Sequence, residues 1–145
     1  VRKNINFFYS AEKKFYNNFW KRLSKFKLKI KKNKTYLLKF IKKTISLNKS
    51  IHIYGASTKG NIILQYCKID QNLIKFAADR NPDKFNRFTP GSNIKIISEK
   101  KSRALKPDYY LVMPWHFEKE IIKREKLFSL HGGKLLFPLP EFKII

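Results

Sequence analysis

Along most of the chain, short runs of apolar residues alternate with stretches in which apolar residues recur at helical spacing. This pattern predicts strands separated by helices. From residue 50 onward, short apolar runs predict five strands, at residues 51–54, 74–78, 94–97, 109–112 and 134–137. Helical spacing predicts helices over residues 59–67, 99–105 and 117–130, the last one ended by Gly132 and Gly133 as a C-cap.

This alternation of strands and helices predicts an α/β fold. Strands that are joined through helices pair in parallel, because the connection crosses the sheet in the right-handed sense. We therefore expect a Rossmann-like, doubly wound and mostly parallel sheet of five strands, in the order 3-2-1-4-5.

The first 49 residues follow a different pattern, in which apolar residues recur at helical spacing among many lysines. The series runs from Phe15 to Ile45 and predicts one long amphipathic helix, or two helices broken near Asn33, with Ser10 as the N-cap. We therefore divide the chain into a basic amphipathic helix, residues 1–49, and an α/β domain, residues 50–145.

The charge is the most unusual feature of the composition, because 33 Lys and Arg face only 10 Asp and Glu, for a net charge of +23. Such a balance is typical of proteins that bind nucleic acids or anionic membranes. However, 27 of the 33 basic residues are lysine, and a dedicated phosphate-binding surface more often uses the bidentate guanidinium of arginine. We favour a solvated lysine-rich surface, with neither a nucleic acid nor a membrane as partner.

No apolar run approaches the length of a transmembrane helix, and residues 1–10 do not resemble a signal peptide. The single cysteine, Cys67, cannot form an internal disulfide or a zinc site by itself. We therefore expect a cytoplasmic protein without a metal site. The chain starts with Val rather than Met, which indicates a fragment or a processed chain.

In a sheet of this order, ligands bind at the carboxyl ends of the strands, where the order reverses between the first and fourth strands. Two loops meet there, residues 55–60 and residues 113–116. In the first loop Gly55 permits a tight turn from strand to helix, and Ser57 and Thr58 are good helix N-caps. Lys59, just before Gly60, places a positive charge beside the free backbone N–H groups at the start of the helix.

A phosphate or diphosphate is the natural ligand of such a loop. The loop is neither a Walker A motif nor a G-x-G-x-x-G motif, and a purely structural turn is an equal alternative.

Asp79 ends the second strand, where dinucleotide-binding folds place an acid that holds the ribose hydroxyls. The alternative is an acid that caps the turn that follows it. The polar loop over residues 79–91 is long enough to suggest a function, and its Arg80, Lys84 and Arg87 could meet a diphosphate.

The loop after the fourth strand contains Trp115 and His116. Trp115 offers a flat face for stacking, and His116 is the only imidazole expected at the reversal of the sheet. The alternative for His116 is a helix-terminal residue that bonds to the backbone. We keep a role in ligand binding or proton transfer for His116 as a hypothesis.

Several short motifs together resemble one known family. They are Tyr-Gly-Ala-Ser-Thr-Lys-Gly at 54–60, Asp-Arg-Asn-Pro-Asp-Lys at 79–84, Thr-Pro-Gly at 89–91, Pro-Asp-Tyr at 107–109, Pro-Trp-His-Phe at 114–117 and Gly-Gly-Lys at 132–134. In this order and spacing, the set resembles the C-terminal domain of S-adenosylmethionine (SAM)-dependent nucleotide-sugar C-methyltransferases, which act on deoxyketosugars. The resemblance covers residues 12–140.

The resemblance implies a domain that helps to bind the nucleotide sugar, of dTDP type, while a base elsewhere removes the proton next to the ketone. It also implies that a zinc-binding module and a SAM-binding domain precede this one, as they do in the family. The family's cysteine cluster, SAM motif and Glu-His segment are absent from this chain. Alone, the chain should therefore not catalyse methyl transfer, and it should bind no cofactor. The alternative is a stand-alone Rossmann module that binds a nucleotide such as NAD.

The predicted substrate-binding residues are Gly55, Ser57, Thr58, Lys59, Gly60, Asp79, Arg80, Lys84, Thr89, Trp115 and His116.

Overall fold

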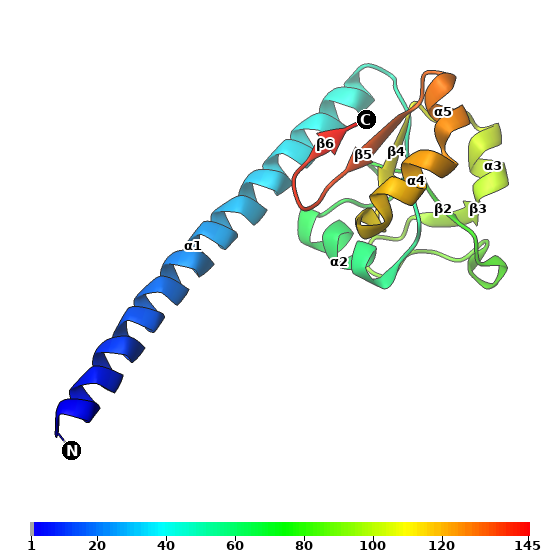
Figure 1. The fold of residues 1–145 in the computed structure, drawn as a ribbon. Helices are drawn as coiled ribbons and strands as arrows, with labels where there is room; N and C mark the ends of the chain where they lie inside the picture. The colour runs from blue at the N-terminus through cyan, green and yellow to red at the C-terminus, as the bar shows by residue number, and fades with distance from the viewer. Residues whose placement is uncertain (1) are drawn as a thin grey trace. The chain divides into compact units, whose positions relative to one another are not determined.

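The computed structural model describes residues 2–145, with side chains from residue 5 onward, and its strands and helices alternate as predicted (Figure 1). The elements are α1 Arg2–Ser46, β1 Ile51–Tyr54, α2 Thr58–Cys67, β2 Phe76–Asp79, η1 Pro82–Lys84, β3 Lys95–Ser98, α3 Glu99–Ala104, β4 Tyr109–Val112, η2 Trp115–Phe117, α4 Glu118–Arg124, α5 Lys126–Leu130, β5 Lys134–Phe137 and β6 Lys143–Ile144. Here η marks a short 3-10 helix.

The sheet has six strands in the order β3-β2-β1-β4-β5-β6. The first five strands are parallel and stand in the predicted order, whereas β6 pairs antiparallel with β5. The prediction of five strands was therefore wrong by one edge strand. A strand of two residues shows no alternation of apolar and polar side chains, so the sequence pattern could not reveal it.

The basic N-terminal segment forms one continuous helix, α1, rather than two. Ser10 does not cap it, because the helix already begins at Arg2 and the Ser10 hydroxyl donates a hydrogen bond to the Phe7 carbonyl within the helix. By contacts, the chain divides into two compact units, residues 1–34 and residues 35–145. The second unit therefore includes the last turns of α1, and the division between residues 49 and 50 stays a prediction.

Within the second unit, two apolar clusters cover the two faces of the sheet. Ile51 and Ile53 of β1 point to one face, which the end of α1 and helix α2 cover with Leu37, Ile41 and Leu64. The alternate residues of β1 point to the other face, where α3, α4 and α5 lie. Burial on both faces explains why the strands are apolar runs rather than half-polar ones.

The predicted helix over residues 117–130 is in fact η2, α4 and α5 in succession. The break between α4 and α5 falls at Glu125, which has non-helical backbone angles and a buried side chain. Gly132 follows α5 with a φ of +88°, so the predicted glycine C-cap is confirmed.

Helix α2 packs closely against the start of the loop that follows β4. A Cβ atom at Gly60 would lie 2.7 Å from the Cβ of Met113, which is buried. The glycine therefore lets the two loops at the carboxyl end of the sheet approach each other.

We expect Gly60→Ala to destabilise the domain by about 1–3 kcal/mol, because the added methyl group overpacks this contact. Helix propensity alone would give the opposite sign, since Ala is favoured over Gly by about 1 kcal/mol inside a helix. Urea unfolding measures the difference, and Ile62→Ala on the exposed side of α2 is the control, expected within about 0.5 kcal/mol of the parent. A more stable Gly60→Ala protein would contradict the close packing.

Candidate functional site

A cleft of about 440 Å³ lies at the carboxyl ends of β1, β2 and β4, where the strand order reverses. It is lined by Tyr54, Gly55, Asp79, Arg80, Glu99, Pro114, Phe117, Glu120, Ile121 and Arg124. Parallel sheets bind their ligands at this position, because the loops at the carboxyl ends diverge there and leave a crevice. The cleft is therefore the candidate site.

The turn from β1 into α2 forms one wall of the cleft. Gly55 has a φ of +84°, and a Cβ atom there would lie 2.9 Å from the Pro114 ring, so both the backbone and the space require glycine. The Ser57 hydroxyl caps α2 by accepting the Gly60 N–H at 3.0 Å. Thr58 and Lys59 are exposed in the first turn of α2 but do not line the cleft.

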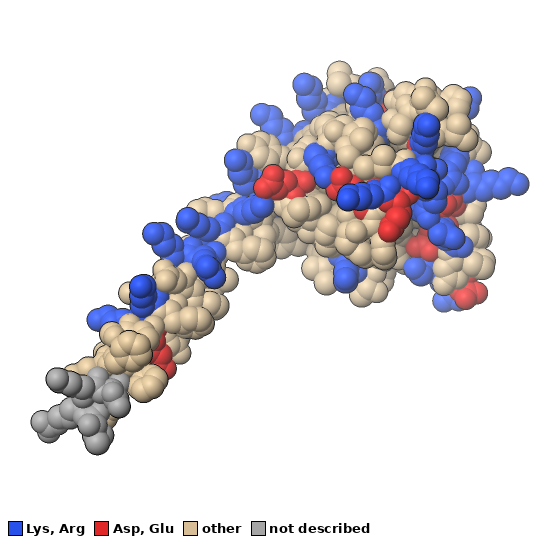
Figure 2. Space-filling view, in the orientation of Figure 1, with Lys and Arg blue, Asp and Glu red and all other residues tan. Residues whose placement is uncertain are grey.

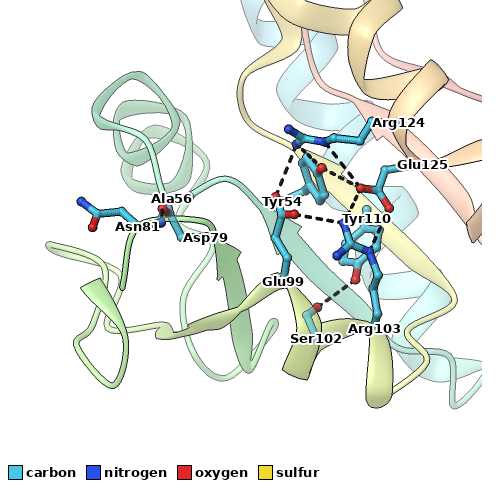
Figure 3. A network of polar contacts seen from close by, with 10 residues as sticks. All are labelled: Tyr54, Ala56, Asp79, Asn81, Glu99, Ser102, Arg103, Tyr110, Arg124 and Glu125. Carbon is cyan, nitrogen blue, oxygen red and sulfur yellow. Dashed lines mark hydrogen bonds and ion pairs between the residues drawn. The ribbon is translucent and has the colours of Figure 1, made fainter. Parts of the chain in front are cut away.

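The carboxylate of Asp79 ties the two loops of this wall together (Figure 3). It accepts the Ala56 N–H and the Asn81 N–H, each at 2.9 Å, and the Lys84 ammonium at 3.2 Å. Lys84 also donates to the Ala56 carbonyl at 3.0 Å. Asp79 therefore makes the contacts of a turn-capping acid, and Lys84 holds the loop closed.

Arg80 and Thr89 have different places in the loop over residues 79–91. Arg80 lines the cleft and is exposed, and its side chain forms no hydrogen bond or ion pair within residues 2–145. Thr89 is buried away from the cleft, where its hydroxyl accepts the Ile94 N–H and contacts Ser92. Arg80 is thus the predicted cation that remains available to a ligand.

The residues after β4 do not all reach the cleft. Trp115 is half-buried against the apolar cluster on the α4 side of the sheet. His116 is exposed, and its ring lies between Trp115 and Phe117, with centroid distances of 5.8 and 4.3 Å. Phe117, with 52% of its surface exposed, is the exposed aromatic side chain of the cleft lining, whereas Tyr54 of the same lining is buried.

A polar network forms the opposite wall and joins β1, α3 and α4 (Figure 3). Glu125 is only 2% exposed; it accepts the Tyr54 hydroxyl at 2.7 Å and the Arg103 guanidinium at 2.6 Å. Arg103 also binds Glu99 at 3.0 Å. Arg124 donates to the Tyr54 hydroxyl and to Glu99, and two arginines thus face two glutamates.

These contacts have electrostatic consequences. The hydrogen bond from Arg103 to Glu125 raises the pKa of the guanidinium, so Arg103 stays charged. Burial, followed by the contact with the Glu125 carboxylate, raises the pKa of the Tyr54 hydroxyl. Tyr54 therefore stays protonated and donates its hydrogen bond at neutral pH.

Sequence patterns alone did not find several residues of the cleft. Glu99, Glu120 and Arg124 lie on helices α3 and α4, and helical periodicity shows only which side of a helix is polar. The sequence held one signal for Glu99, its position directly after the end of β3, because ligands bind at the carboxyl ends of parallel strands. Of the predicted set, the structure brings Gly55, Asp79 and Arg80 to the lining of the cleft.

The comparison with known families is decisive at this point. A family model described as "C-methyltransferase C-terminal domain" matches residues 1–140. The chain belongs to the C-methyltransferase C-terminal domain family. The predicted family resemblance is therefore confirmed.

One relative of this C-methyltransferase domain is the C-methyltransferase NovU of Streptomyces niveus. The two are 35% identical over 105 residues, which make up 72% of this chain and 25% of NovU. The chain thus spans about a quarter of the length of this relative. The cleft described above is the cleft of a methyltransferase-family domain.

Two features are absent from the described residues, 2–145, of this C-methyltransferase domain. No helix among them is long and apolar enough to cross a membrane. No group of three or more His, Cys, Asp and Glu side chains among them is placed to hold a metal ion.

We expect Glu125→Ala to destabilise the domain by about 1–3 kcal/mol, because it removes one of the two carboxylates that pair with Arg103 and Arg124 and takes away the acceptor of the buried Tyr54 hydroxyl. Chemical denaturation measures the change. Glu120→Ala is the matched control in the same stretch of chain, since Glu120 is exposed and forms no ion pair within residues 2–145. A loss for Glu125→Ala as small as that of the control would contradict the assigned role of the network.

Beside this network, His52 is buried and its Nδ1 atom lies 2.8 Å from the Ser102 hydroxyl. Burial lowers the pKa of His52 to about 4. In the unfolded chain the pKa is about 6.5, so the unfolded state binds more protons between these values and stability falls as the pH falls through this window. At pH 5 the loss is about 2 kcal/mol.

The variant His52→Asn keeps a polar atom near Ser102 but removes the titrating ring. Unfolding by urea at pH 7.5 and pH 5.0 should show a loss of stability about 2 kcal/mol larger in the parent than in this variant. Equal losses in both proteins would show that His52 is already free to accept a proton in the folded state.

Proposed function

We propose that this domain binds the nucleotide-sugar substrate of a SAM-dependent C-methyltransferase and orients the sugar for methyl transfer to carbon. The expected substrate is a dTDP-linked deoxyketosugar, and the expected setting is the cytoplasm. The observation that carries the proposal is the cleft at the carboxyl ends of β1, β2 and β4, in a domain that belongs to a C-methyltransferase family.

Within residues 2–145, the cleft lining carries two unpaired charged groups, the Arg80 guanidinium and the Glu120 carboxylate, and of these Arg80 supports an anionic ligand held at one point. Asp79 is paired with Lys84, and Glu99 is paired with Arg103 and Arg124. After these pairings Arg80 is the cation of the lining that keeps a free guanidinium, and a guanidinium binds a phosphate through two parallel hydrogen bonds. Phe117 offers an exposed ring on the same cleft for a sugar or a base.

The residues of this cleft do not fit SAM. An acid that clamps the ribose of such a cofactor accepts hydrogen bonds from its hydroxyls, and the Asp79 carboxylate already uses three of its roughly four acceptor sites on the Ala56 N–H, the Asn81 N–H and the Lys84 ammonium. We therefore assign the methyl donor, and the base that removes the sugar proton, to other parts of the enzyme. The same contacts of Asp79 weigh against the alternative of an NAD-binding module.

The role that remains for this domain is to supply binding energy for the nucleotide-sugar substrate. Contacts to the nucleotide and diphosphate, remote from the reacting carbon, would hold the sugar in one orientation and so lower the entropic cost of the reaction. By itself the domain would catalyse no methyl transfer.

In the complete enzyme, Arg80→Ala should weaken the binding of dTDP by about tenfold or more, because a charged hydrogen bond to phosphate is lost. Lys59→Ala and His116→Ala should have smaller effects, since neither side chain lines the cleft. Isothermal calorimetry measures these affinities.

Arg87→Ala is the matched control for Arg80→Ala, because Arg87 is an exposed arginine of the same loop that does not line the cleft. It should bind dTDP as the parent does. Unchanged affinity in Arg80→Ala, or a response to NAD as strong as that to dTDP, would overturn the proposed function.

A further inference from the structure

Large apolar side chains are exposed along the first part of α1. We call Phe8, Phe15, Phe19, Leu23 and Phe26 the aromatic stripe; between 42% and 68% of the surface of each is exposed. Their separations of seven, four, four and three residues place them on one face of the helix. Tyr16 and Trp20 flank the stripe with 56% and 59% exposed. A contiguous exposed patch of this kind marks an interaction surface.

The spacing of the stripe continues into residues that are buried. Ile30, Leu37 and Ile41 follow Phe26 at intervals of four, seven and four residues, and Leu37 and Ile41 are 2% and 0% exposed in the core of the second unit. The residue spacing of the aromatic stripe in the first unit is thus the same as the spacing of core residues in the second unit. This shared spacing indicates that a protein surface covers the stripe and packs against it as tightly as in a protein core.

The lysines of this segment argue against a second copy of the same helix as that cover. Residues 2–34 contain 12 Lys and Arg but a single acid, Glu12. On the face of this part of α1 that Figure 2 shows, basic side chains lie along one edge and uncharged side chains lie along the other. Pairing two such helices would bring like charges together at the rims of the stripe, whereas a surface with an acidic rim would attract them.

Glu12 argues against a lipid surface. It lies four residues after Phe8 and three before Phe15, in the middle of the stripe, and its carboxylate forms no ion pair within residues 2–145. On a membrane this carboxylate would point into the acyl region, at a large cost in free energy. A protein surface can instead offer a cation opposite Glu12.

We propose that the aromatic stripe docks into an apolar groove with an acidic rim, and with a basic group opposite Glu12, on another part of the same methyltransferase. The inference rests on the proposed function, since it requires that the complete enzyme extends beyond this domain. The relative NovU fits this requirement, because the matched region covers 25% of its length.

Hydrogen exchange in the complete enzyme tests this docking without any substrate. Amides of residues 8–26 should exchange about 100-fold or more slowly than in a free helix, because docking prevents local opening. Phe19→Ser should remove most of this protection, whereas the control Lys21→Ser, on the polar face, should keep it. Exchange that is fast in the parent, or equal in both variants, would overturn the proposal.

Glu12→Leu separates the possible partners. If the stripe docks on a protein surface that places a cation opposite Glu12, the variant loses this ion pair. The amides of residues 8–26 should then exchange faster in Glu12→Leu than in the parent. Binding to vesicles of phosphatidylserine and phosphatidylcholine that is stronger in Glu12→Leu would overturn the proposal in favour of a membrane. A dimer in sedimentation velocity that Phe19→Ser dissociates would overturn it in favour of a second copy. The affinity for dTDP is measured separately. A complete enzyme that does not bind dTDP but keeps its slow amide exchange over residues 8–26 would contradict only the proposed function.

Discussion

The face of the sheet that α3, α4 and α5 cover depends on the burial of one carboxylate, that of Glu125. A buried charge must be paired, and here Tyr54 of β1 and Arg103 of α3 supply the partners. Because these partners come from different elements, the position of Glu125 determines how α3 and α4 approach β1. The break between α4 and α5 falls at the same residue.

This network also determines where a ligand can bind. A second cleft, of about 820 Å³, lies at the amino ends of β4 and β5, and Arg124 lines both clefts. The ion pairs of Arg103 and Arg124 therefore separate the two clefts. They also neutralise Glu99, which would otherwise repel an anion from the smaller one. The carboxyl-end cleft is thus left with Arg80 as its free cation.

The sequence predicted the alternation of elements, the order of five strands and the family, because apolar runs and turn residues are local signals. It did not predict β6, which has only two residues, or the break at Glu125, which depends on partners far along the chain. For the same reason motifs located Gly55, Asp79 and Arg80 but not the groups on α3 and α4. Thr89 and Lys84 are predicted ligand contacts, but sequence motifs did not show that the Thr89 hydroxyl is buried on the Ile94 N–H or that the Lys84 ammonium binds Ala56 and Asp79.

A crystal structure of the complete enzyme with dTDP tests the central claim most directly. The account predicts that the diphosphate lies in the cleft at the carboxyl ends of β1, β2 and β4, within hydrogen-bond distance of the Arg80 guanidinium, and that Glu125 keeps its contacts to Tyr54 and Arg103. A diphosphate bound outside this cleft, at the amino-end cleft or on another domain, would contradict it.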